Sequence, residues 1–94
     1  MPAKRRYSQV PRWIDELDDR CLYEVAIEAW VARRSAVRAG ADKDDRARRI
    51  LAAADQTMDQ VASGRVTGQR ACRLAATATR KYNSALERME RLAS

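Results

Sequence analysis

Histidine and phenylalanine are absent from this 94-residue sequence, and aromatic residues make up only 5% of it. Without histidine, the chain lacks both the usual base of a catalytic triad and the commonest metal ligand. Its two cysteines, Cys21 and Cys72, are far apart and form no CxxC motif, whereas a structural zinc site normally needs four Cys or His ligands. We therefore expect no metal and no cofactor, with both cysteines as small buried residues.

Long apolar runs are also missing. No stretch is long enough to cross a bilayer, and there is no signal peptide, so we expect a soluble, cytoplasmic protein without a membrane partner. The sequence contains no glycine-rich loop of the kind that cradles phosphates. Together with the lack of histidine, this favours a binding protein over an enzyme.

Alanine and arginine are the abundant residues. Eighteen alanines allow close helix packing, but each buries little surface, so at roughly 25 cal/mol per Å² the core is expected to be marginal alone. Association into a homodimer is a natural remedy for a domain of this size. Lysine and arginine outnumber the acids 19 to 13, giving a net charge of +6 that favours a polyanionic partner.

The pattern along the chain predicts an all-α protein. Residues 1–10 form a polar, basic tail that cannot bury itself and is expected to be flexible. Residues 11–94 are expected to form a single domain of three long helices. The first begins between Pro11 and Asp15 and ends near Ala39. The second runs from Asp42, as an N-cap, to Ser63, and the third from Thr67, as an N-cap, to about Leu92. Short turns between long helices predict an antiparallel three-helix bundle.

The stretch "VASGRVTGQRACRLA" (residues 61–75) joins the last two predicted helices and resembles the turn of a DNA-binding helix-turn-helix. In that motif the two helices meet at a steep angle. Here the flanking apolar stripes are long and continuous, which favours side-by-side packing. We therefore expect a hairpin bend.

The first predicted helix has two apolar faces, although a three-helix bundle needs only one. The second face carries aromatic residues, which often anchor protein–protein interfaces. Alternatively, the N-terminal tail covers Trp30, and Trp13 is a packing anchor of the domain. The candidate protein interface consists of Trp13, Tyr23, Ile27, Trp30 and Val31.

The last predicted helix has an apolar seam from Ala71 to Leu92 and a basic stripe about a third of a turn away from it. Thr77 and Ser84 lie between the cations and could donate hydrogen bonds to phosphate oxygens. No aromatic residue interrupts the stripe, which disfavours a stacking platform for single strands. Alternatively, the stripe is solvated, or paired with acids such as Asp55. With the tail, the candidate nucleic-acid-binding residues are Lys4, Arg5, Arg6, Arg70, Arg73, Arg80, Lys81, Arg88 and Arg91.

Two functions are compatible with these patterns. In the first, a homodimer binds DNA or RNA largely through the backbone, in an accessory or regulatory role. In the second, the chain is an adaptor or inhibitor, such as one encoded by a phage or plasmid, that docks through the aromatic face. The run "IDELDDRCLYEVAIEAWVARR" also resembles the first helix of small all-helical chorismate mutases, but a full set of their active-site residues cannot be placed on this chain. We favour nucleic-acid binding because the tail and the stripe are both basic.

Overall fold

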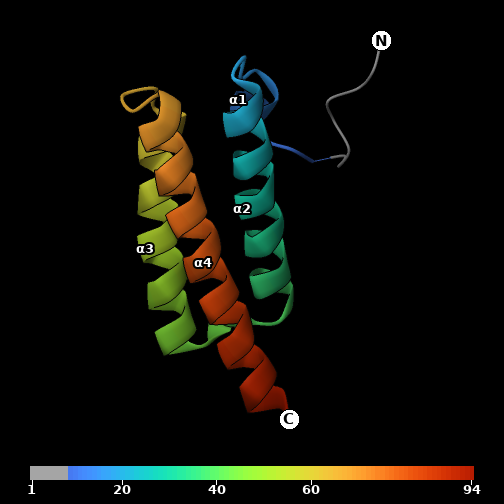
Figure 1. Cartoon of the computed structure of the whole chain (residues 1–94). Coiled ribbons are helices and arrows are strands. Elements are labelled where there is room, and N and C mark those ends of the chain that lie inside the picture. Colours follow the sequence, from blue (N-terminus) through green and yellow to red (C-terminus); the bar gives the residue numbers. More distant parts are fainter. Residues whose placement is uncertain (1–8) are drawn as a thin grey trace.

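The computed structural model describes residues 9–94, so the predicted tail cations Lys4, Arg5 and Arg6 lie outside the described residues. Within residues 9–94 the chain is helical and contains no strand, which confirms the all-α class. No helix in this range is long and apolar enough to cross a membrane. The elements are α1 (Arg12–Asp15), α2 (Arg20–Arg38), the 3-10 helix η1 (Ala41–Lys43), α3 (Asp45–Ala62) and α4 (Gly68–Ala93) (Figure 1).

The prediction of one continuous first helix is wrong, because residues 16–19 separate α1 from α2. Asp19 is the N-cap of α2: its backbone is extended, and its carboxylate accepts a hydrogen bond from the Leu22 N–H at 3.0 Å. Aspartate favours such caps over helix interiors because its side chain competes for nearby backbone N–H groups. Of the nearby acids, Asp15 therefore ends α1, and Glu16 and Asp18 lie in the break that follows it.

The start of α3 also differs from the prediction. Gly40 adopts the left-handed conformation (φ +95°) expected after the end of α2, but Asp42 belongs to η1 and is not the N-cap. Asp44 has that role, and its carboxylate accepts a hydrogen bond from the Ala47 N–H at 3.0 Å. Thr67 occupies the N-cap position of α4 as predicted, although its side chain makes no capping hydrogen bond.

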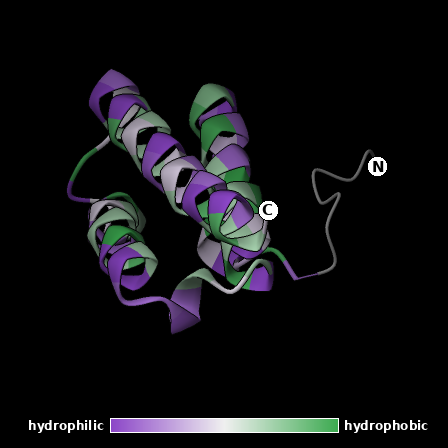
Figure 2. Cartoon of the chain, turned by 90° about the horizontal axis from the view of Figure 1, so that it is seen from below, coloured by the Kyte–Doolittle hydropathy of each residue, from purple (hydrophilic) through white to green (hydrophobic). Residues whose placement is uncertain are grey.

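Helix α4 is the centre of the fold. It packs against both α2 and α3, whereas α2 and α3 hardly contact each other. Figure 1 shows α2 and α4 running in the same direction, with α3 opposite to both, and the views in Figures 1 and 2 together place α4 beside each of the other two long helices. The segment 61–75 is thus a bend between helices that pack side by side along their length.

Alanine fills most of the core. Eleven alanines are buried, among them Ala26 and Ala29 of α2, while Tyr82 and Ile14 are the largest fully buried side chains. The predicted seam of α4 is correct for Ala71 and Tyr82, but Leu92 is 58% exposed because the last turns of α4 extend past the ends of its neighbours (Figure 1). The expectation of two buried cysteines is wrong, since Cys21 is exposed and Cys72 only half-buried.

Candidate nucleic-acid interface

The predicted basic stripe follows α4 along nearly its whole length. From Arg70 to Arg91, at 1.5 Å per residue, it extends for about 32 Å. Arg70, Arg73, Arg80 and Arg91 are exposed, and Lys81 is half-buried. Within residues 9–94, none of these five cations forms an ion pair. The stripe is therefore a row of uncompensated charges on a rigid helix.

Arg88 is the exception among the stripe residues. Its Nε and Nη2 atoms donate to the two carboxylate oxygens of Asp44, at 2.7 and 3.4 Å, and its side chain is only 28% exposed. The hydrogen bonds from Arg88, and then that from the Ala47 N–H, lower the pKa of Asp44 below its usual range. Arg88 thus joins the end of α4 to the start of α3. The cations of the stripe that form no ion pair within residues 9–94 are Arg70, Arg73, Arg80, Lys81 and Arg91.

A groove between α3 and α4 widens the basic surface beyond the stripe. It is lined by Arg49, Ile50 and Ala53 of α3 and by Lys81 and Ser84 of α4. Arg49 is exposed, and no acidic residue lines the groove. The sequence analysis omitted Arg49 from the site because it considered only the stripe of one helix. The register of α3 against α4, which brings Arg49 beside Lys81, is not visible in either helix alone.

The side chains between the cations are short. The hydroxyl of Thr77 accepts a hydrogen bond from Arg80 Nη2 at 3.1 Å, which holds that guanidinium close to the helix surface. Ala76 and Ser84 are also small, so a polyanion can approach α4 closely between its arginines. Helix α4 contains six basic and two acidic residues, and the acids, Glu87 and Glu90, are confined to its last two turns.

Asp55 does not neutralise the stripe, contrary to the alternative considered for it. Its carboxylate oxygens accept hydrogen bonds from Arg33 of α2, at 2.9 and 3.1 Å, and from the hydroxyl of Tyr82. Burial, followed by the hydrogen bond to Asp55, raises the pKa of the Tyr82 hydroxyl above its usual value. This contact joins α2, α3 and α4 through three side chains and leaves the cations of α4 available.

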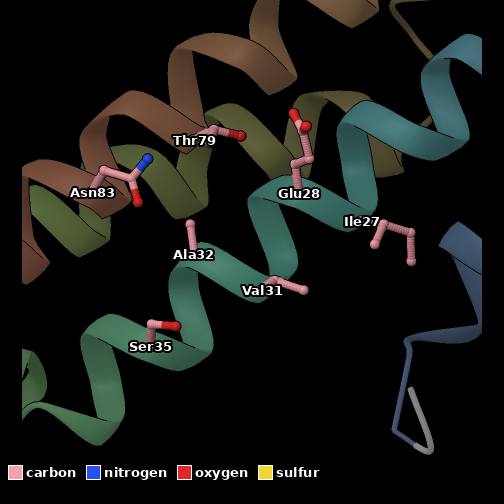
Figure 3. Close-up of a pocket in the computed structure, with 7 residues that line it drawn as sticks. All are labelled: Ile27, Glu28, Val31, Ala32, Ser35, Thr79 and Asn83. Carbon is pink, nitrogen blue, oxygen red and sulfur yellow. The ribbon is translucent and has the colours of Figure 1, made fainter. Parts of the chain in front are cut away.

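The residues predicted as a protein interface occupy two different environments. Trp13, Tyr23 and Trp30 are half-buried against the core, and the guanidinium of Arg34 lies 4.8 Å from the ring centre of Trp30. Ile27, which also packs against the core, and Val31 line a shallow groove between α2 and α4 (Figure 3). The other residues of this groove are Glu28, Ala32, Ser35, Thr79 and Asn83.

Comparisons with known protein families, with curated proteins and with solved structures find no match for this chain. The surface chemistry of residues 9–94 is therefore the basis on which a function can be proposed.

Proposed function

We propose that this protein binds nucleic acid, mainly through the phosphate backbone, with the basic surface of α4 and with Lys4, Arg5 and Arg6 of the N-terminal segment. The observation that carries the proposal is the row of five cations on α4 that form no ion pair within residues 9–94. Cations that are already paired contribute little to binding a polyanion, because an internal carboxylate must first be displaced. Unpaired ones exchange only water and mobile ions for phosphate.

Binding of this kind is driven by the release of counterions from the nucleic acid. Each phosphate neutralised by lysine or arginine gives a slope of about −0.9 in a plot of log K against log salt for duplex DNA. The five free cations of α4 alone therefore give a slope of about −4.5, which lowers the affinity about 500-fold between 50 and 200 mM salt, and engagement of Lys4, Arg5 and Arg6 as well steepens the slope to about −7. Contacts to the backbone fix position and orientation without reading sequence.

Fluorescence anisotropy with labelled duplex DNA, single-stranded DNA and RNA tests the proposal. We expect binding that persists at physiological salt and weakens with the steep slope given above. Binding that is confined to low salt would mean that the positive charge serves solubility only, and the proposal would be abandoned.

We also propose that the active form is a homodimer. The alanine-rich core supports this, because small side chains bury little apolar surface in one copy of the chain. Sedimentation equilibrium over a range of protein concentrations measures the mass directly. A mass of a single 10.7 kDa chain at the highest concentration would rule out the dimer.

A second candidate function, docking on another protein, is supported by the groove between α2 and α4. Apolar Ile27, Val31 and Ala32 line it, and it lies on the opposite flank of α4 from Lys81 and Ser84. Val31→Asp places a charge in this groove and is expected to abolish such docking, whereas Arg80→Ala is not. If Arg80→Ala weakens binding to nucleic acid and Val31→Asp changes no measured interaction, the first function stands alone.

A further inference from the structure

The groove between α3 and α4 has two cations and a hydroxyl among its lining residues, beside apolar Ile50 and Ala53. Arg49 enters it from α3 and Lys81 from α4, so the two cations face the same groove from different helices. Ser84 adds a hydroxyl, which can donate a hydrogen bond to a phosphate oxygen. Arginine contributes a planar fork of donors and lysine a compact point charge, and both are common phosphate ligands. No acid lines the groove to compete for them.

Aromatic side chains are missing from the same surface. Tyr82 is the only aromatic residue of α3 and α4; it is 1% exposed, and its hydroxyl donates to Asp55. Proteins that bind single strands usually stack the bases on exposed aromatic rings, at about 1–3 kcal/mol per base. The α3–α4 surface offers the bases of a single strand no such platform. A duplex needs none, because its bases are already stacked and paired.

The spacing of the cations also matches a duplex. Arg70 and Arg91 are separated by about 32 Å along α4, one uninterrupted helix of 26 residues. One turn of double-stranded DNA has about the same length, 34 Å. A rigid row of charges of this length suits a partner whose phosphates also hold fixed positions. A flexible single strand would have to lose conformational entropy to match it.

We propose that the ligand of this surface is double-stranded nucleic acid, and that one backbone phosphate lies in the α3–α4 groove between Arg49 and Lys81. This inference rests on the proposed function and makes it specific. It identifies the strandedness of the partner and adds Arg49, on a second helix, to the residues that bind it.

The experiment compares the affinity of the full chain for a duplex of about two helical turns with that for each of its separated strands, at physiological salt. Arms with DNA and with RNA of the same sequence distinguish the two kinds of duplex. We expect at least about tenfold tighter binding of a duplex than of its strands, because the strands lack a stacking platform here. Equal or tighter binding of the single strands overturns the inference but leaves the proposed function intact. Failure of every ligand to bind overturns both.

Variants at the groove test the phosphate site itself. Arg49→Ala and Lys81→Ala are each expected to weaken duplex binding about fivefold and to reduce the salt slope by about 1. Arg48→Ala is the matched control: it removes the same charge from the neighbouring position of α3, but Arg48 is paired with Asp45 at 2.6 Å and does not line the groove. Lys81→Arg should retain the affinity. If Arg48→Ala and Arg49→Ala weaken binding equally, net charge rather than the groove accounts for it, and the phosphate site is refuted.

Discussion

The two grooves beside α4 share a helix and apolar lining residues but differ in charge. The α2–α4 groove is lined by Ile27, Val31 and a single acid, Glu28, whereas the α3–α4 groove is lined by Arg49, Lys81 and no acid. Part of the difference comes from α4, because one flank presents Thr79 and Asn83 and the other presents Lys81 and Ser84. The rest comes from the neighbouring helices, since α2 contributes Glu28 and α3 contributes Arg49. The two candidate functions therefore use separate surfaces, and each can be altered without the other.

Both grooves lie beside α4, and truncation of its buried Tyr82 has the largest expected effect. Tyr82 is one of the two largest fully buried side chains in residues 9–94, and its hydroxyl joins α4 to Asp55 of α3. Tyr82→Ala should lower the free energy of unfolding by about 3–5 kcal/mol, which is a large part of the stability of a small domain. Urea denaturation followed by circular dichroism measures this. A loss below about 1 kcal/mol would show that the side chain does not organise the core. Tyr82→Phe keeps the ring and should cost only about 1 kcal/mol, the net value of one hydrogen bond.

Replacing three unpaired cations of α4 by alanine tests the nucleic-acid surface without altering the residues of the α2–α4 groove. The triple variant Arg73→Ala, Arg80→Ala, Arg91→Ala is expected to weaken nucleic-acid binding about 100-fold at constant salt, because each lost phosphate contact reduces the affinity several-fold. Anisotropy titrations measure the affinity, and an unchanged circular dichroism spectrum shows that the fold is intact. A loss of less than about threefold would place the binding surface elsewhere.

Adding one charge to each groove sharpens the comparison. Ser84→Lys places a cation beside Lys81 and should tighten nucleic-acid binding several-fold and steepen the salt slope by about 1. Ser35→Lys makes the same change in the α2–α4 groove and should leave the slope unchanged. Titrations of both variants with nucleic acid at several salt concentrations measure the affinity and the salt slope of each. Equal gains from the two variants would mean that total charge, and not its position, controls binding.

The smallest effect is expected from Asp44, which caps α3 and binds Arg88 at the end of the basic stripe. Because its pKa in the folded protein is lowered from 3.8, the stabilisation that it provides is present above about pH 4 and is lost as the pH falls through the lower folded pKa. Asp44→Asn should lower Tm by about 5 °C at pH 7 and by progressively less towards pH 2. Thermal melts from pH 7 to pH 2 measure this difference. A constant difference over the whole range would show that the carboxylate charge is not the cause.

Periodicity predicted the long helices and most of the buried residues of α4, because these depend on spacing within one helix. It failed where several residues compete for one role. Asp42 and Asp44 are equally good caps by residue type, and the contact that favours Asp44 comes from Arg88, 44 positions away. The break at residues 16–19 was missed for a similar reason, since Asp19 is one of three acids in that segment.

The candidate site was predicted only as far as a single helix allows. Arg73 and Arg80 are exposed, as the stripe required, but the loss of Arg88 to an ion pair and the addition of Arg49 both depend on how α3 packs against α4. Spacing within a helix identifies which residues share a face. It does not identify the neighbouring helix or the register between the two.

The central position of α4 has a consequence for biosynthesis. Since α2 and α3 pack mainly against α4 and hardly against each other, neither has its apolar partner until residues 68–93 have left the ribosome. Most of the stability of such helices in proteins comes from the packing of their apolar face against other helices. We therefore expect residues 9–67 to remain largely unfolded and sensitive to proteases in the nascent chain until α4 emerges, and the three long helices then to acquire their structure in one step.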